Sequence, residues 1–416
     1  MPEPASPPKG GRRPPRWARW ALGALAVPLA FVGLPAAWEY GSLASIPDIG
    51  DPFDVAAFRR EFPNDVPPER NAFHAYQLAT ATLQPGKYRV FRDILKNGEN
   101  TPTEWRLAGP ELRARVAENR EALDIWREGT GRDEALYHRL EEMTTGTLLD
   151  VTQELRHAFT PLALLEGSRL EEEGDMAGAW GWYRALVRCS RHSGRHGFLI
   201  ERLVGITIYR QATERIERWA ADPRVDADLL RRAKQDLDEA EALRTPDEEV
   251  WKLECMIELE ATRDPKQFRD LIQYSITQRQ GGGAQPTTAF GRILAEMNPS
   301  QWLRQARVAS GSEAERTRRI MQLVWANRLP VLCRPAADRP APLIEDPLIY
   351  PADPATPEAA RKIPPEELAR RIQALPINIF SLEWYPRQIR AIAEEESARR
   401  RVGGELDRQI QLRESP

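Results

Sequence analysis

The stretch that decides the fold reads LLEGSRLEEEGDMAGAWGWYRAL over residues 164–186. A first periodic segment ends near Glu173, and a second runs from Asp175 to Arg191. Upstream, apolar side chains recur at intervals of three and four residues, at Leu148, Val151, Leu155 and Phe159. Because this interval places side chains on one face of an α-helix, the sequence predicts two consecutive helices, with Pro161 marking a kink or a break in the first.

Comparable periodicity extends over most of the chain. Further helices are expected at Phe73–Leu83, from Pro110 through Trp126, and at His196–Ala221, Asp226–Leu243 and Pro386–Leu412. Two more begin at capping boxes, Thr245 with Glu248 and Ser312 with Glu315. No comparable segment alternates apolar and polar residues with β-branched enrichment. The sequence therefore predicts an all-α fold in which strands are scarce.

The quoted stretch also resembles the helical hairpin of a tetratricopeptide repeat. The resemblance covers about one repeat, over residues 164–190, and rests on Leu165, Gly167, Leu170, Gly174, Asp175, Ala179, Tyr183, Ala185 and Leu186. In such hairpins small residues let two antiparallel helices approach, and a short turn joins them. The alanine of the second helix arrives one residue early, and Trp180 and Trp182 are additional. The resemblance implies either degenerate stacked repeats, whose concave surface binds a peptide or protein, or an unrelated helical hairpin.

The N-terminal residues predict a membrane anchor. Residues 1–19 carry five basic side chains and one acidic side chain, whereas residues 20–38 carry no charge. At about 1.5 Å per residue, the uncharged segment is just long enough to cross a hydrocarbon core of roughly 30 Å. The aromatic side chains suited to the headgroup level at its ends are Trp17, Trp20, Trp38 and Tyr40. The positive-inside rule places residues 1–19 in the cytoplasm and the chain after about residue 40 outside it, as in a signal anchor.

Two other interpretations of this segment remain open. A cleaved signal peptide needs small residues before the cut, and a cut near Ala36 and Ala37 leaves Leu34 or Pro35 at a position that should be small. A soluble core helix lacks support because the segment has no polar face. The expected partner of residues 20–38 is therefore the lipid bilayer.

Proline and glycine divide the remainder into four parts. Residues 39–68 form a Pro/Gly-rich stalk with at most a short helix near Val55–Phe62, and residues 69–334 form the all-α domain. Residues 335–365 are dense in proline, which predicts an extended surface segment. Residues 366–416 complete the chain as a C-terminal helical segment. Its Arg399–Arg401 run follows three glutamates, which indicates a solvated, salt-bridged face.

Composition excludes several classes of protein. The chain has 416 residues, of which 41% are hydrophobic and 29% charged, so it can bury a core and is not mostly disordered. A mean hydropathy of -0.55 excludes a polytopic membrane protein. The net charge of -3 divides into +4 on the N-terminal tail and -7 on the rest. Neither value supports nucleic acid as a partner.

Cys189, His192 and His196 are the candidate metal ligands. Offsets of three and four residues put them on one side of a helix, and thiolate and imidazole are ligands of zinc. Two glycines nearby suggest that the helix ends here, and Arg191 and Arg195 would oppose a cation. We therefore favour a polar, basic helix end over a metal site. No phosphate-binding loop occurs, and we expect no cofactor.

The three cysteines, Cys189, Cys255 and Cys333, are too few for a disulfide scaffold. Outside the cytoplasm one pair could bridge, and the sequence does not select it. Cys255 lies on the periodic face of its helix and is expected to be a buried, small apolar residue.

These observations favour a single-pass membrane protein whose helical extracytoplasmic domain acts as a protein-binding or peptide-binding scaffold. No catalytic residues can be assigned, and a non-enzymatic role is preferred. The leading alternative is a membrane-tethered hydrolase that uses dispersed carboxylates or the Cys/His cluster. A structural component of a bacterial envelope is the third class. The sequence leaves the partner and the oligomeric state open.

Overall fold

The computed structural model describes residues 43–84, 103–143, 150–264, 266, 268–269, 312–342, 349–373, 375 and 385–415. The described residues form helices and no strand; an isolated bridge joins Asn71 to Glu134. The all-α prediction is confirmed. The expected anchor, with Trp17, Trp20, Trp38 and Tyr40, lies outside the described residues. Among the helices that the structure does describe, none combines the length and the apolar character needed to span a membrane.

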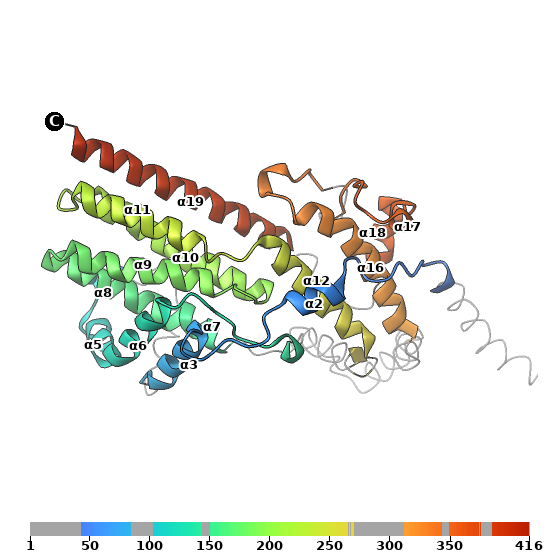
Figure 1. Cartoon of the computed structure of the whole chain (residues 1–416), viewed down its shortest axis with the longest axis horizontal. Coiled ribbons are helices and arrows are strands. Elements are labelled where there is room, and N and C mark those ends of the chain that lie inside the picture. The colour runs from blue at the N-terminus through green and yellow to red at the C-terminus, as the bar shows by residue number, and fades with distance from the viewer. Residues whose placement is uncertain are drawn as a thin grey trace, which may run out of the picture.

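The longer helices are α3 (Ala72–Thr82), α5 (Pro110–Glu118), α6 (Arg120–Thr130), α8 (Thr160–Glu173), α9 (Met176–His192), α10 (Leu199–Ala221), α11 (Ala227–Glu241), α12 (Asp247–Arg263), α16 (Ser312–Leu332) and α19 (Tyr385–Glu414). Further elements are α2 (Val55–Glu61), α7 (Asp150–Glu154), the π-helical turn η4 (Leu155–Phe159), α17 (Glu358–Arg361) and α18 (Pro365–Gln373). Helices α8, α9 and α10 form successive antiparallel hairpins, α11 packs against α9, and α19 runs along α10 and α11 (Figure 1). Helices α12 and α16 to α18 gather at the other end of the molecule (Figure 1).

The hairpin of α8 and α9 forms where the sequence predicts two helices. Gly174 ends α8 with a φ of 88°, a left-handed conformation that glycine adopts readily, and the Asp175 carboxylate then caps α9 by accepting from the Gly178 N–H at 2.8 Å. A Cβ on Gly167 would lie 2.4 Å from the Tyr183 ring, so the two helices approach as closely as a glycine allows. This hairpin, which includes Trp182, builds the larger core together with Trp126 of α6 and Trp219 of α10.

Several local predictions differ from the structure. The expected helix behind Pro110 is two helices, because the chain turns at Asn119 between α5 and α6. The capping box at Thr245 is wrong: α12 begins at Asp247 after Pro246, no side chain caps it, and the Thr245 hydroxyl makes no hydrogen bond. Proline lacks an N–H and fixes its own φ, so Pro246 takes the capping position itself.

The two proline-rich segments pack against the helices. In the expected stalk, Ile46 lies in a core cluster with α16, and Val55 and Phe62 lie in another with α12. In the expected extended segment, Ile349 and Tyr350 are buried. Both segments contain apolar side chains between their prolines, and burial of that apolar surface outweighs the local preference for an extended, exposed chain.

Candidate functional site

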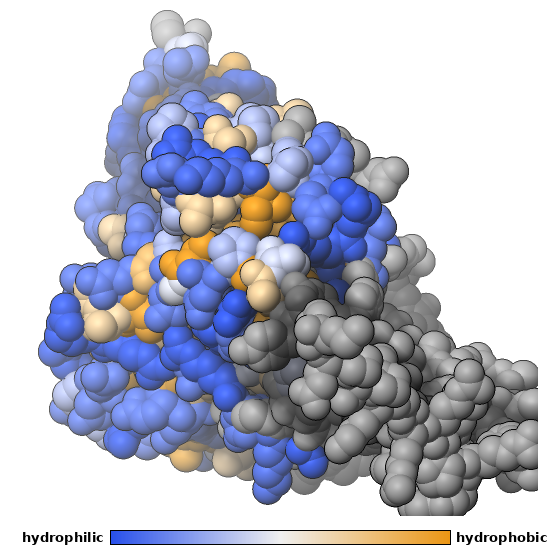
Figure 2. All heavy atoms as spheres, turned by 90° about the vertical axis from the view of Figure 1, so that its right-hand side faces the viewer, coloured by the Kyte–Doolittle hydropathy of each residue, from blue (hydrophilic) through white to orange (hydrophobic). Residues whose placement is uncertain are grey.

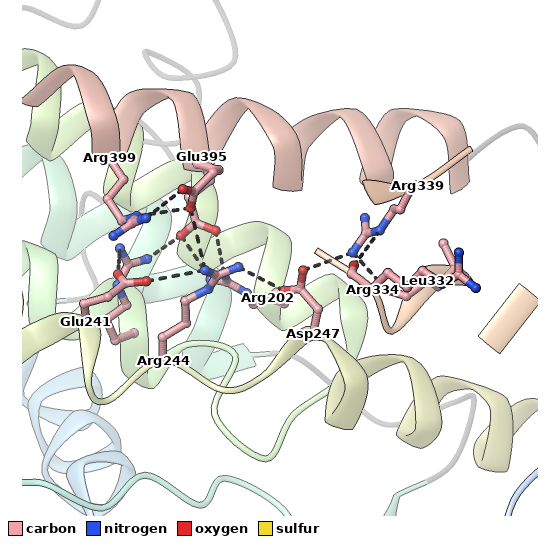
Figure 3. Close-up of polar contacts among 11 residues, drawn as sticks. Arg202, Glu241, Arg244, Asp247, Leu332, Arg334, Arg339, Glu395 and Arg399 are labelled. Carbon is pink, nitrogen blue, oxygen red and sulfur yellow. Dashed lines mark hydrogen bonds and ion pairs between the residues drawn. The ribbon is translucent and has the colours of Figure 1, made fainter. Parts of the chain in front are cut away.

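A buried cluster of arginines surrounds one glutamate where four helices meet. Arg191 lies in the last turn of α9, Arg202 lies at the end of the first turn of α10, Arg244 follows α11, and Glu395 comes from α19. Arg191, Arg202 and Glu395 are almost fully buried. Charged groups without water require partners of opposite charge, and this cluster supplies them from segments that are far apart in the sequence (Figure 3).

The carboxylate of Glu395 connects the arginines of the cluster, because it accepts hydrogen bonds from two of them. Nη1 of Arg202 donates to Oε1 of Glu395 at 3.2 Å, and Nη2 of Arg202 donates to Oε2. Nη1 of Arg191 also donates to Oε1 of this carboxylate. Arg191 additionally contacts Glu241 at 2.8 Å and lies 4.0 Å from the centroid of the Tyr209 ring. Burial raises the pKa of Glu395, but the charges of Arg202, Arg191 and Arg244 outweigh it and hold that pKa below its ordinary value. Glu395 is therefore a carboxylate at neutral pH.

Arg244 links the buried cluster to a second group of charges at the start of α12. Its guanidinium contacts Glu241 at 3.4 Å and Asp247 at 3.1 Å. Asp247 also accepts from Arg339 at 3.2 Å, and Arg339 donates to the backbone oxygens of Leu332 and Arg334 at the end of α16 (Figure 3). A cation at a helix C-terminus satisfies carbonyls that lack intrahelical partners. The network thus ties α12 to the end of α16.

A cleft of about 680 Å³ opens beside this network. Three segments line it: the α11–α12 connection, the chain after α16, and the N-terminal half of α19. Its charged side chains belong to Glu241, Arg244, Asp247, Arg334, Glu396 and Arg400, and its apolar wall includes Ile392, Ala393 and Pro335. Its size falls within the range of about 300–1,000 Å³ that is typical of ligand sites. We take this cleft as the candidate functional site.

The charged side chains around the cleft differ in whether they form ion pairs. Glu241, Asp247 and Glu396 each form an ion pair with an arginine. Arg334 pairs with Asp353 and keeps 41% of its side chain exposed. Arg400 is exposed and forms no ion pair with any residue that the structure describes. Among the charged groups that line the cleft, Arg400 is therefore the one without an ion-pair partner in the described chain, and it lies beside an apolar wall.

The candidate metal ligands lie elsewhere. Cys189 is fully buried, burial raises the pKa of its thiol to about 12, and the thiol lies against Trp126, Tyr76 and Ser193. Nδ1 of His192 lies 2.7 Å from the Tyr76 hydroxyl, and burial with nearby arginines lowers the pKa of His192 to about 3. Nδ1 of His196 lies 2.7 Å from Glu249 instead. In the described ranges no three histidine, cysteine, aspartate or glutamate side chains are placed to hold one metal ion.

The remaining sequence candidates are distributed as follows. Cys189, Cys255 and Cys333 are free thiols; Cys255 is buried, as predicted, and Cys333 lines the cleft. His74 is exposed on α3. Arg399 and Arg401 form surface ion pairs with Glu396 and Glu217, in line with a salt-bridged face.

Glu395 is the residue that the sequence interpretation missed. We took the three glutamates before Arg399 as one solvated run, yet Glu395 points inward. A signal for this exists in the spacing, because Glu395 falls between Ile392 and Ala398, and the same face continues at Val402 and Leu406. An acidic residue in register with an apolar helix face predicts a buried ion pair, and only the folded chain identifies its partners.

Comparison with known proteins yields no match: no protein-family model, no curated protein and no solved structure is similar to this chain at a significant level.

Proposed function

We propose that the chain is a single-pass, membrane-anchored binding protein. Residues 20–38 anchor it, residues 1–19 lie in the cytoplasm, and the helical body lies outside and binds a peptide or a segment of another protein in the cleft beside Arg244. The observation that carries the proposal is the composition of that cleft, which combines an apolar wall at Ile392 and Ala393 with two cations, the exposed Arg400 and the partly buried Arg334, which pairs with Asp353. A peptide with apolar and acidic side chains complements both features.

The close hairpin of α8 and α9 supports the same class of function. Gly167 against Tyr183, and the turn at Gly174 and Asp175, are the features on which the resemblance to a tetratricopeptide hairpin rests. Hairpin arrays present extended surfaces to peptides. The hydrolase alternative has weaker support, because the described carboxyls with raised pKa, Glu201 and Glu254, do not line the cleft.

Topology is tested by fusing a reporter that is active only outside the cytoplasm to residue 416. An active fusion supports the outward orientation, and a silent one that is present at normal levels overturns it. A second fusion at residue 19, ahead of the proposed anchor, is the matched control and should be silent.

Binding is tested by selecting short peptides from a random display library on the full chain in detergent. We expect enriched peptides that combine acidic and apolar residues. The double variant Arg334→Glu with Arg400→Glu should lose them, because it reverses the cations of the cleft. The variant Arg232→Glu changes an exposed arginine of α11 outside the cleft and should retain them. Peptides that bind all three proteins equally, or no enrichment at all, would contradict the proposed site.

A further inference from the structure

The segment that follows the proposed anchor is fixed to one end of the helical body. Ile46 is 3% exposed and packs in a cluster with Ile320, Leu323, Leu368 and Ile372, which belong to α16 and α18. Only four residues, 39–42, separate Leu43, where the described chain begins, from Trp38, the last residue of the proposed span. This end of the molecule therefore lies next to the chain that leaves the bilayer.

Arginine side chains hold the segment in place. Arg319 of α16 donates to the backbone oxygens of Leu43 at 3.4 Å and Ile46 at 3.0 Å. Arg371 of α18 donates to the Ser45 oxygen at 3.3 Å, and Arg318 pairs with Asp48 at 2.8 Å. Hydrogen bonds from charged donors are stronger than those between neutral groups. Together with the burial of Ile46, they make this segment part of the body and leave no free stalk after Leu43.

The covalent chain then limits how far the body can stand from the membrane. A fully extended chain spans at most about 3.6 Å per residue, so the five residue-to-residue steps from Trp38 to Leu43 reach about 18 Å. Helix α19 has 30 residues and is about 45 Å long, and its C-terminal end lies at the opposite end of the molecule from α17 and α18 (Figure 1). The tether is thus short compared with the body it holds.

The surface at this end is suited to polar headgroups. Figure 2 views the molecule from the side on which Figure 1 places α17 and α18, and the described surface there is mainly hydrophilic with small hydrophobic areas between. The apolar side chains Leu368, Ala369 and Ile372 face the core, and Arg361, Lys362 and Arg370 are exposed. Lys362 pairs with Glu358 and Arg370 with Glu367, whereas Arg361 forms no ion pair within the described residues. A basic side chain without an ion-pair partner is attracted to anionic headgroups that lie within a Debye length of it.

We propose that the end of the body formed by residues 43–49, α17 and α18 rests on the headgroup layer of the membrane, with the C-terminal end of α19 directed away from it. This orientation rests on the proposed anchor. It assigns to the α17–α18 surface a lipid partner, and it leaves α19 and its cleft open to partners beside or beyond the membrane.

The test uses the full chain, reconstituted with its body outward in vesicles that contain anionic lipid and a headgroup-linked energy-transfer acceptor. In a Cys333→Ser background, a donor dye is attached at Lys362→Cys beside α17 or at Gln411→Cys near the end of α19; both native side chains are exposed. We expect several-fold higher transfer from position 362 than from position 411. Equal transfer, or higher transfer from position 411, overturns the orientation even when the chain floats with the vesicles. A chain that does not float overturns the anchor and the orientation together.

A charge-reversal pair tests the headgroup contact itself. Arg361→Glu should reduce the transfer from position 362 on anionic vesicles and leave it unchanged on neutral ones, because it replaces a favourable charge by a repulsive one. Arg232→Glu, an exposed arginine of α11, is the matched control and should change neither value. If both variants behave like the parent chain on anionic vesicles, Arg361 does not contact the headgroups and the proposed contact surface is wrong.

Discussion

Arg202 of α10 and Glu395 of α19 form a two-point ion pair that is closed to solvent: their side chains are 2% and 3% exposed. Arg191 donates to the same carboxylate from α9. The pair therefore determines how α19 docks on the hairpins. A buried ion pair adds little to stability compared with a well-packed apolar pair, but removal of one member leaves the other charge buried and uncompensated.

Glu395→Ala should lower the free energy of unfolding by about 3–5 kcal/mol, because Arg191 and Arg202 then lose their common partner. Urea unfolding of the full chain, followed by tryptophan fluorescence, measures the change. Glu394→Ala is the matched control. Its side chain is 50% exposed and contacts Arg210 at 3.5 Å on the surface, so it should cost less than about 1 kcal/mol. If both substitutions change the free energy of unfolding equally, the buried ion pair contributes no more to stability than the surface pair of Glu394.

Helix positions were largely predictable from sequence, because each helix carries its own apolar period. Gly174 with Asp175, and Pro110, mark helix ends through properties of single residues, and the structure confirms them. The cleft was not predictable in this way. No local sequence pattern distinguishes Arg244, Arg334 and Arg400 from the other arginines of the chain. They line one cleft because α19 packs against α10 and α11, more than a hundred residues earlier in the sequence. The partners of Glu395 depend on the same long-range return.

Gly167→Ala should destabilise the chain by about 1–3 kcal/mol, the usual cost of overpacking a core. The added Cβ would lie 2.4 Å from the Tyr183 ring. Tyr183 cannot move away easily, since it is fully buried and its hydroxyl donates to Glu171 at 2.5 Å. Thermal unfolding checks the effect. Gly181→Ala should instead be neutral or stabilising by up to about 1 kcal/mol, since nothing lies within 4 Å of its Cβ position and alanine favours a helix. If both substitutions change the stability in the same direction, the close approach of α8 and α9 is contradicted.

Cys333 should be the first thiol to react with an alkylating reagent, and it should react slowly at pH 7. Burial and the nearby Glu248 raise the pKa of the Cys333 thiol to about 11, so little thiolate exists at neutral pH. Because the thiolate is the reactive form, the alkylation rate of Cys333 should increase as the pH rises toward about 11. Cys189 and Cys255 are fully buried and should react only after unfolding. Mass spectrometry after timed alkylation distinguishes the three. A selected peptide that occupies the cleft should protect Cys333, which lines it. Faster labelling of Cys189 or Cys255 in the native chain would be inconsistent with their burial.

Glu201→Gln should reduce the pH dependence of stability between about pH 4.3 and pH 8. Burial raises the pKa of Glu201 to about 8 in the folded chain, whereas an unfolded glutamate titrates near about 4.3. Over this interval the folded state binds more protons than the unfolded state, so the free energy of unfolding decreases as the pH rises. The stabilising effect is complete below about pH 4.3 and is lost as the pH passes through about 8. Glutamine cannot ionise and removes this contribution.

Urea unfolding at a series of pH values measures the slope. Glu214→Gln changes an exposed glutamate of the same helix, α10, and should keep the slope of the unmodified chain. If Glu201→Gln also keeps that slope, Glu201 is already ionised at low pH in the folded protein. Water would then have to reach its carboxylate beside the Phe198 N–H, which donates to it at 2.7 Å, and the packing of Gly197 and Phe198 around it would be looser than the structure describes.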